Sequence, residues 1–176
     1  MIDKVAALLR FIMVKLAKRG VQLPRVSYIG RHTLIQGKNG GTISARGKIR
    51  LDHDTELVSL GSITLGENFV MNGYSRIVAH QRIEIGNNVV IARFVSILDH
   101  DHAFEKNASD GSLVFDGYNM APIRIGNNVW LGDKVSILKG VTIGDNVIIG
   151  ANAVVTKDIP SNTIAGGIPA KVIKHL

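Results

Sequence analysis

The chain has 176 residues, a net charge of +7 and 45% hydrophobic residues, which suits one folded domain with a substantial core. The absence of cysteine excludes disulfides and thiol-ligated metals, and an aromatic content of 5% argues against base stacking in a nucleic-acid site. No stretch has the pattern of a secretory signal, so we expect a cytoplasmic protein that binds no nucleic acid.

Residues 1–20, MIDKVAALLRFIMVKLAKRG, are predicted to form an amphipathic helix that ends near Gly20. Five basic residues against one acidic residue give this segment +4 of the total charge, and it is too short and too charged to span a bilayer. Two interpretations stay open: the helix packs on the rest of the chain or on a neighbouring subunit, or it lies peripherally on the anionic cytoplasmic face of the inner membrane. Its predicted apolar face comprises Ile2, Val5, Ala6, Leu9, Ile12, Met13 and Leu16.

A six-residue repeat fills most of the remaining chain. Its aliphatic positions are clearest at Ile125, Leu131, Ile137, Ile143, Ile149 and Val155. A second apolar register follows each of these by four residues, a spacing that fits neither a helix nor one long strand but predicts short strands joined by turns. Three repeats would close one triangular coil of eighteen residues, and stacked coils would rise by roughly 4.8 Å each. Earlier segments repeat less regularly, and the frame slips by two residues between Ile83 and Ile85.

The segment PIRIGNNVWLGDKVSILKGVTIGDNVIIGANAVVTKDIPSNTIAGGIPAKVI resembles the left-handed β-helix hexapeptide acyltransferases, above all the maltose, galactoside and surface-polysaccharide O-acetyltransferases. The resemblance covers roughly residues 25 to 174. It implies an all-β solenoid, a left-handed parallel β-helix over residues 21–165, followed by a short tail over residues 166–176. The left hand comes from the resemblance alone, because crossovers between parallel strands are generally right-handed. The resemblance also implies a homotrimer, acetyl-CoA as cosubstrate, no required metal and a sugar or glycan acceptor.

Residues 98–122 interrupt the repeat and are expected to protrude as a loop without disturbing the coils on either side. The loop contains His100 and His102, and imidazole can remove the proton of a sugar hydroxyl at cytoplasmic pH. The resemblance implies that His102 is the catalytic base, with His100 as the second candidate. Asp99 or Asp101 could orient an imidazole.

Further site residues are implied by the resemblance. Asn72 and His80 would lie on the acceptor side, and His80 stands where the maltose and galactoside enzymes have an aspartate, so simple maltose or galactoside specificity is in question. Lysine in place of the family's arginine can supply a point charge to a coenzyme phosphate but not a bidentate contact. The implied coenzyme-side residues are Trp130, Ala151, Thr156, Lys171 and Lys174.

The sequence therefore predicts an acetyl-CoA-dependent O-acetyltransferase that modifies a sugar of a surface polysaccharide or its precursor. Three other functions stay open. The first is N-acetylation of an amino sugar or an antibiotic, the second is a zinc enzyme of the carbonic-anhydrase kind that would use His80, His100 and His102 as ligands, and the third is a solenoid that only binds partners.

Overall fold

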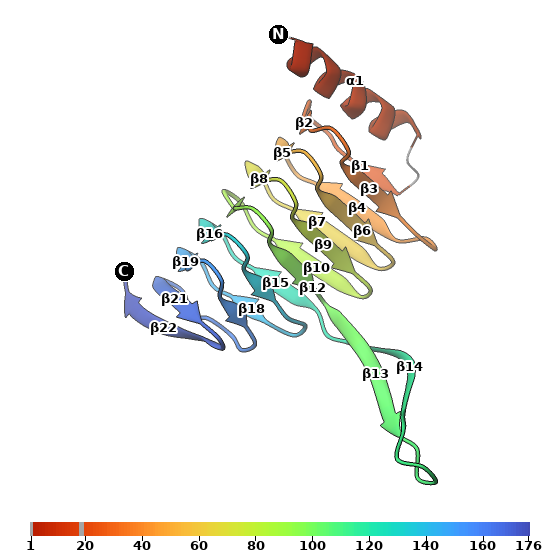
Figure 1. The fold of residues 1–176 in the computed structure, drawn as a ribbon. Coiled ribbons are helices and arrows are strands. Elements are labelled where there is room, and N and C mark those ends of the chain that lie inside the picture. Colours follow the sequence, from red (N-terminus) through yellow and green to blue (C-terminus); the bar gives the residue numbers. More distant parts are fainter. Residues whose placement is uncertain (1, 18–19) are drawn as a thin grey trace.

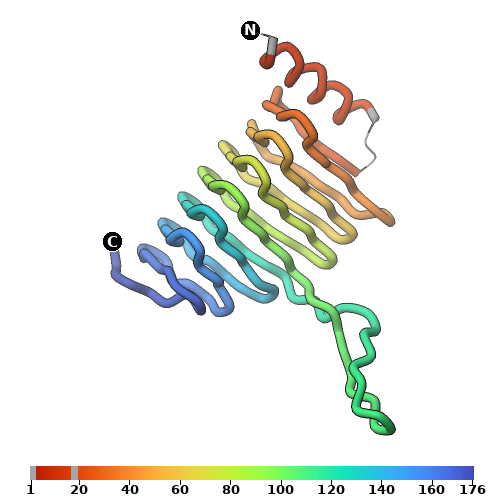
Figure 2. The backbone as a smooth tube through the Cα atoms, in the orientation of Figure 1, coloured from red at the N-terminus to blue at the C-terminus, as the bar shows by residue number. Residues whose placement is uncertain are grey.

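The computed structural model describes residues 2–17 and 20–176, and the chain folds as a three-sided parallel β-solenoid with one helix at its N-terminal end (Figures 1 and 2). The predicted fold, a parallel β-helix from the repeat with the left hand implied by the resemblance, is confirmed. Met1, Lys18 and Arg19, which belong to the predicted helical segment, lie outside the described residues.

Three parallel sheets form the sides of the solenoid, and each coil contributes one short strand to each sheet. Sheet A contains β1 (Val21–Gln22), β4 (Thr42–Ala45), β7 (Ser62–Leu65), β10 (Arg82–Ile85), β15 (Ile123–Ile125) and β18 (Thr142–Ile143). Sheet B contains β2 (Tyr28–Ile29), β5 (Ile49–Leu51), β8 (Phe69–Met71), β11 (Val90–Ile91), β16 (Val129–Leu131), β19 (Val147–Ile149), β21 (Thr163–Gly167) and the antiparallel β22 (Ala170–His175). Sheet C contains β3 (Leu34–Gly37), β6 (Glu56–Ser59), β9 (Arg76–Ala79), β12 (Ser96–Leu98), β17 (Ser136–Ile137) and β20 (Val154–Val155).

The repeat positions stack in register inside the solenoid. Ile63 pairs with Ile83, and Ile83 pairs with Ile123 across the inserted segment, so aliphatic side chains of successive coils lie directly above one another. These side chains are almost completely buried and form one continuous core along the solenoid. The six-residue period therefore marks the inward positions, as predicted.

The predicted coil of eighteen residues holds after the inserted segment, between β15 and β20, but the first coil spans twenty-two residues and the step from β19 to β21 spans sixteen. Arg124 pairs with Thr142, eighteen residues on, whereas Ile63 pairs with Ile83, twenty residues on. The two additional residues lie in the turns that lead from sheet C to sheet A, here called the CA corner. From the inward Ile137 of sheet C to the inward Val141 of sheet A is four residues, whereas the corresponding step in an earlier coil is six. The two-residue slip of the repeat between Ile83 and Ile85 is therefore explained by this longer corner.

The other corners are built from residues in the left-handed region of backbone space. At the turns from sheet A to sheet B, asparagines with φ near 55° bond to one another from coil to coil through their side-chain amides, as Asn88 does with Asn128 at 3.0 Å. At the turns from sheet B to sheet C, here called the BC corner, Tyr74 and Phe94 adopt φ of 61° and 59°, and their rings stack with centroids 5.0 Å apart. Side-chain ladders thus compensate for a conformation that costs a bulky residue energy.

Helix α1 (Ile2–Ala17) closes the N-terminal end of the solenoid. Ala7 and Phe11 are the side chains that α1 buries on the first coils, with exposed fractions of 2% and 4%, and the Arg10 Nε–H donates to the Ile29 carbonyl at 3.1 Å. The apolar face predicted from the sequence is a different one: its members Leu9 and Met13 are exposed. The helix instead packs through the small Ala7 and the flat Phe11, which allow it to approach the coil closely. Within the described residues no helix is long and apolar enough to cross a membrane.

Candidate functional site

A β-hairpin leaves the solenoid at the CA corner, in the segment where the sequence predicted a protruding loop (Figure 1). Its strands are β13 (His100–Lys106) and β14 (Leu113–Met120), which pair antiparallel. At the base of the hairpin the Ala121 N–H donates to the Asp99 carbonyl at 3.0 Å, and the solenoid resumes with sheet A at Ile123. The insertion thus leaves the coils above and below it in register.

The three histidines singled out from the sequence meet at the base of this hairpin. The rings of His80 and His100, from successive coils, stack with centroids 3.5 Å apart and an interplanar angle of 10°. Tyr118, on the opposite hairpin strand, contacts all three imidazoles, with ring centroids 4.4 Å from His80, 5.5 Å from His100 and 4.8 Å from His102. His102 is exposed, whereas His80 and His100 are partly buried.

Asp99 is the residue that fixes this corner. Its side chain has no exposed surface, and its carboxylate accepts backbone N–H groups of His80, Gln81 and Arg82 at 2.7, 2.8 and 2.7 Å. The same carboxylate lies 3.2 Å from the His100 Nδ1. One buried carboxylate therefore ties the longer CA corner of one coil to the next and sets the orientation of His100.

Asp101 has a different role from Asp99. It pairs with the Lys139 ammonium, which comes from the CA corner of the following coil, and this hydrogen bond lowers the pKa of the Asp101 carboxyl. Because Asp99 is bonded to His100 and Asp101 to Lys139, neither carboxylate is available to orient His102. Within the described residues the ring of His102 contacts that of Tyr118, which is its direct cross-strand neighbour.

The electrostatics of the cluster favour the neutral form of His80. Burial, and then the nearby ring of His100, lower the pKa of His80 below its ordinary value of 6.5. A neutral imidazole can accept a proton or a hydrogen bond from a hydroxyl group, which a protonated one cannot. The site thus presents three imidazoles and a phenol along the exposed base of the hairpin.

The stacking of His80 on His100 does not suit a shared metal. Two parallel rings 3.5 Å apart direct their nitrogens outward, side by side, whereas zinc ligands converge on one point with tetrahedral angles. Among residues 2–17 and 20–176 no group of three His, Cys, Asp or Glu side chains has the arrangement that could hold a metal ion.

Asn72 and Trp130, the other predicted site residues with polar or aromatic side chains, lie elsewhere on the protomer. Asn72 follows β8 at the BC corner, where its N–H donates to the Ile91 carbonyl at 2.9 Å. Trp130 stands in the middle of β16 and points outward from sheet B with 53% of its surface exposed. One protomer therefore does not bring these residues to the histidines.

Trp130 is part of an apolar ladder on the outer face of sheet B. Outward positions pair in register from coil to coil through Val70, Val90, Trp130, Ile148 and Ile164. The corresponding ladder on sheet A is polar, and runs Ser44, Thr64, Glu84, Arg124 and Thr142. An exposed row of aliphatic and aromatic side chains on one sheet is typical of an interaction surface.

The remaining coenzyme-side candidates lie toward the C-terminal end. Lys174 is opposite Ile164 and extends the apolar ladder with a cation, and Lys171 lies on the same strand, β22. Ala151 is exposed at the BC corner, and Thr156 is exposed directly after β20. Of these, Lys174 is the residue that the structure aligns with Trp130.

Sequence reasoning missed three features of the site. Tyr118 shows in the sequence only as an aromatic residue of the inserted segment, and its contact with all three histidines depends on the antiparallel pairing of β13 with β14. Lys139 gave no signal, because it is one of many lysines. The continuous ladder on sheet B could have been read from the sequence, since its members are the residues between two inward positions of each repeat.

Comparisons with known proteins agree with this architecture. Residues 122–157 match the family model described as bacterial transferase hexapeptide, six repeats. The chain is 46% identical over 123 residues to the galactoside O-acetyltransferase of Escherichia coli (strain K12), a match that covers 67% of this chain and 57% of that protein. It is 38% identical over 119 residues to the putative lipopolysaccharide biosynthesis O-acetyl transferase WbbJ of the same organism, covering 65% of this chain and 61% of that protein.

Solved structures give the same picture. A maltose O-acetyltransferase from Clostridium difficile 630 is similar with a TM-score of 0.53 and 29% identity, over 91% of this chain and 68% of that one. An N-acyltransferase from Bacillus cereus, solved with dTDP and 3-hydroxybutyryl-CoA, shares the fold with a TM-score of 0.67 at 23% identity, over 85% of this chain and 82% of that one. The resemblance to hexapeptide-repeat acyltransferases drawn from the sequence is confirmed. The chain spans 57% and 61% of the two curated relatives named above.

Proposed function

We propose that this chain, a homologue of the hexapeptide-repeat acyltransferases, is an acetyl-CoA-dependent O-acetyltransferase that acetylates a sugar hydroxyl in surface-polysaccharide synthesis. The observation that carries the proposal is the cluster of His80, His100, His102 and Tyr118 at the base of the inserted hairpin. The relatives named as galactoside, maltose and lipopolysaccharide O-acetyltransferases support the reaction class and the sugar acceptor.

His102 is the proposed general base. It is the exposed imidazole of the cluster, so it can reach a hydroxyl group held outside the hairpin, whereas His100 is held by Asp99. His102 removes the proton as the hydroxyl oxygen attacks the thioester carbonyl. Backbone N–H groups at the coil edge would hold the resulting oxyanion. When the carbon–sulfur bond breaks, the same proton passes to the coenzyme A thiolate, so His102 ends the cycle neutral.

The acceptor side of the proposal involves Asn72 and His80. The ring of His80 is fixed by its stacking on His100 and by contact with Tyr118, and its lowered pKa keeps it neutral near pH 7. A fixed neutral imidazole can accept or donate one hydrogen bond to a sugar hydroxyl. The relatives' aspartate would offer acceptors alone, so the acceptor sugar is proposed to differ from that of the maltose and galactoside enzymes.

The coenzyme side involves Trp130, with Ala151, Thr156, Lys171 and Lys174, and implies a homotrimer. In a three-sided solenoid the CA corner lies opposite sheet B, so His102 and Trp130 of one protomer face away from each other. If both residues act on the same acetyl-CoA, they must come from two copies of the chain. The apolar ladder of sheet B is then the surface on which the pantetheine arm and the neighbouring protomer pack.

The first test uses the lack of cysteine in this chain. A thiol reagent added to protein, acetyl-CoA and a panel of sugars reports only released coenzyme A. Acceptor-dependent release should fall by about 10²–10⁴-fold in His102→Ala, the range expected for loss of a general base. Retention of activity in His102→Ala with loss in His100→Ala would overturn the assignment of the base. No release with any sugar, nucleotide-linked sugar or lipid-linked glycan would overturn the proposed function.

A mixing experiment tests the composition of the site. His102→Ala and Trp130→Ala chains, each with low activity alone, are unfolded together and refolded as mixed trimers. If each site takes its base from one chain and its tryptophan from the next, some mixed sites are intact and activity reappears. If the site lies within one chain, no mixed trimer contains an intact site and activity stays low.

Amino-sugar N-acetylation is the second candidate, favoured by the fold shared with the Bacillus cereus N-acyltransferase. Mass spectrometry of the product before and after mild base separates the two reactions, because an O-acetyl ester is hydrolysed and an amide is not. We propose further that the enzyme works in the cytoplasm, with residues 1–20 in peripheral contact with the inner membrane.

A further inference from the structure

Helix α1 is apolar on two opposite sides, of which the solenoid covers only one. Ala7 and Phe11 are buried on the first coils. Residues two positions away from them along the chain lie about 200° around the helix axis, that is, on the opposite side. The exposed apolar side chains there, with their exposed fractions, are Val5 (57%), Leu9 (57%), Ile12 (41%), Met13 (67%) and Leu16 (81%). We call these five residues the outer face of α1.

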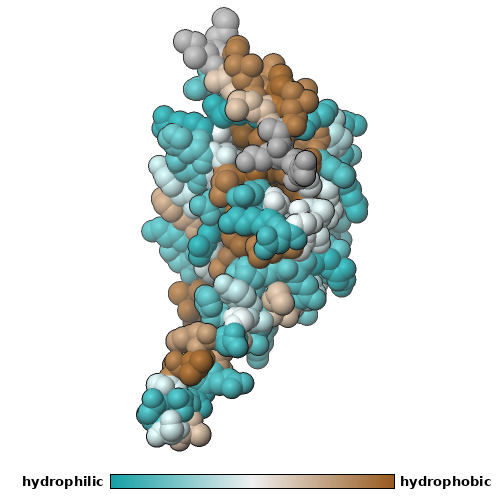
Figure 3. Space-filling model, turned by 90° about the vertical axis from the view of Figure 1, so that its right-hand side faces the viewer, coloured by the Kyte–Doolittle hydropathy of each residue, from teal (hydrophilic) through white to brown (hydrophobic). Residues whose placement is uncertain are grey.

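The outer face is too apolar to be an ordinary solvated helix surface. In a helix that needs only one apolar side, the opposite side is charged or polar. Here the opposite side carries five exposed apolar side chains, and Figure 3 shows apolar side chains gathered at this end of the molecule. Single exposed leucines need no explanation, but a contiguous apolar surface marks an interaction site.

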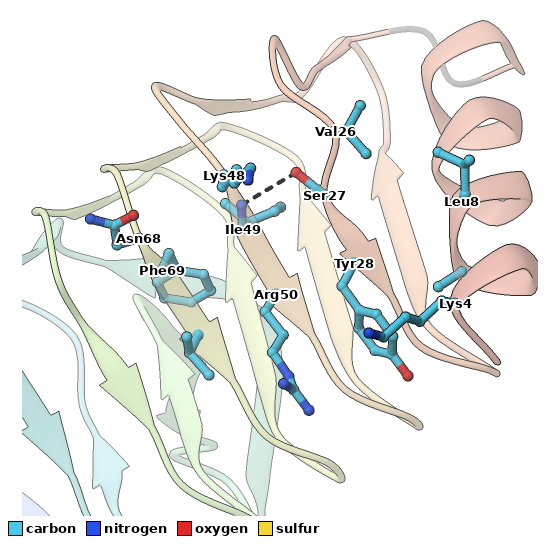
Figure 4. A pocket seen from close by; sticks show the side chains of 12 residues that line it. Lys4, Leu8, Val26, Ser27, Tyr28, Lys48, Ile49, Arg50, Asn68 and Phe69 are labelled. Atoms are coloured by element: carbon cyan, nitrogen blue, oxygen red, sulfur yellow. Dashed lines mark hydrogen bonds between the residues drawn. The ribbon is translucent and has the colours of Figure 1, made fainter. Parts of the chain in front are cut away.

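One flank of α1, between the buried side and the outer face, is basic. Lys4 points over the edge of sheet B, where a groove of 520 Å³ separates Leu8 from Val26 and Tyr28 (Figure 4). Two more cations, Lys48 and Arg50, line the same groove. Lys15, in the last turn of α1, lies on the same flank as Lys4, eleven residues or about three turns further on. Apolar side chains bordered by lysines are typical of helices that lie in the headgroup region of a bilayer.

The position of the helix selects between a lipid surface and another protein chain. α1 lies across the end of the solenoid (Figures 1 and 2), and its outer face, opposite the buried Ala7 and Phe11, is turned away from the coils. Neighbouring copies that pack side by side through sheet B would not cover an end. In a trimer with parallel solenoids, three such ends would face one plane, which matches the geometry of a membrane.

We infer that the outer face of α1 binds the surface of a bilayer that contains anionic phospholipid, with Lys4 and Lys15 beside the phosphate groups. This inference rests on the proposed function only in its choice of membrane, which is the one whose cytoplasmic face would present a glycan acceptor. The binding itself requires no acetyl transfer.

The test is cosedimentation of the full-length protein with vesicles, either pure phosphatidylcholine or an equimolar mixture with phosphatidylglycerol. The native protein should sediment with the mixed vesicles and far less with pure phosphatidylcholine. Lys4→Gln with Lys15→Gln should weaken partitioning into mixed vesicles about 30-fold, from about fivefold for each lysine near an anionic surface. Leu9→Asp with Met13→Asp should abolish binding to both kinds of vesicle.

Matched controls lie on the hairpin. Phe115→Asp with Lys106→Gln changes an exposed apolar residue and an exposed cation at the far end of the hairpin, and should leave sedimentation unchanged. Circular dichroism and elution volume check that the α1 variants keep their helix and their oligomeric state.

Three results would overturn the inference: native protein that stays in the supernatant with anionic vesicles, equal binding by the Leu9 and Met13 double variant, or a smaller oligomer in that variant. The last would identify the outer face as a contact between protein chains. Release of coenzyme A with the full panel of sugars, nucleotide-linked sugars and lipid-linked glycans is measured in parallel. Vesicle binding without acetyl transfer would refute the proposed function and leave this inference standing. Acetyl transfer without vesicle binding would refute this inference and leave the proposed function standing.

Discussion

Replacing Asp99 by alanine should destabilise the fold more than any other change at the candidate site. The carboxylate is completely buried and accepts three backbone N–H groups of residues 80–82 at 2.7–2.8 Å. A net contribution of about 1.5 kcal/mol for each hydrogen bond to a charged acceptor gives a loss of about 4 kcal/mol. For a chain of this size each kcal/mol lowers the midpoint of thermal unfolding by about 2–4 °C, so Asp99→Ala should unfold about 10 °C earlier.

The assay is thermal unfolding followed by circular dichroism at one fixed protein concentration, with Asp101→Ala as the matched control. Asp101 carries the same charge two residues away, but its side chain is half exposed and pairs with Lys139 at the surface, so its loss should shift the midpoint little. Asp99→Asn should fall between the two, because its amide keeps one acceptor oxygen and brings an N–H₂ group toward backbone donors. If Asp99→Ala and Asp101→Ala unfold at the same temperature, the reasoning that one carboxylate holds the CA corner is refuted.

Three other changes give independent checks. Because the pKa of His80 is lowered from 6.5, the unfolded chain takes up a proton at higher pH than the folded chain does. The contribution of His80 to the free energy of unfolding should therefore be full above pH 6.5 and fall as the pH drops below it. His80→Gln should flatten that fall in unfolding curves measured at several pH values. Gly61→Ala should lower the free energy of unfolding, measured with a chemical denaturant, by about 1–3 kcal/mol, because its Cβ would lie 2.1 Å from the Gln81 carbonyl oxygen. Gly150→Ala is the control and should be tolerated, because its Cβ would meet nothing nearer than 3.6 Å. Trp130→Ala should raise the KM for acetyl-CoA about tenfold, as expected for the loss of one large apolar contact of this exposed side chain, and an unchanged KM would remove Trp130 from the coenzyme site.

The solenoid could be predicted from the sequence because its physical cause is local and repeated. Each inward aliphatic residue contacts its equivalent in the next coil, so the same requirement recurs at a fixed spacing and appears directly in the chain. The length of the early coils could not be predicted in the same way. Residues such as His80 and Gln81 form the longer CA corner because a carboxylate from the next coil accepts their N–H groups, and nothing in their own spacing indicates that partner.

The candidate site was only partly accessible to sequence reasoning for a related reason. The interruption at residues 98–122 indicated where side chains would leave the solenoid, and the resemblance supplied roles for His102 and His100. The contacts among His80, His100 and Tyr118 join two coils and a hairpin strand, and they depend on the cross-strand register of β13 and β14. For helix α1, periodicity identified the larger apolar face, and it could not show that the fold buries the smaller face through Ala7 and Phe11.

The outer faces of sheets A and B and the CA corner of the solenoid carry different kinds of side chains, which suit different functions. Sheet A presents polar and charged ladders such as Glu84 with Arg124, which suit contact with water. Sheet B presents an apolar ladder around Trp130, and the CA corner between sheets C and A carries the histidine hairpin. A repeat that must keep only its inward residues aliphatic leaves its outward positions free to vary, so an apolar outer ladder reflects a requirement other than folding. Because that ladder and the hairpin lie on opposite sides of one protomer, a reaction that needs both a coenzyme surface and a base is best served where two copies of the chain meet.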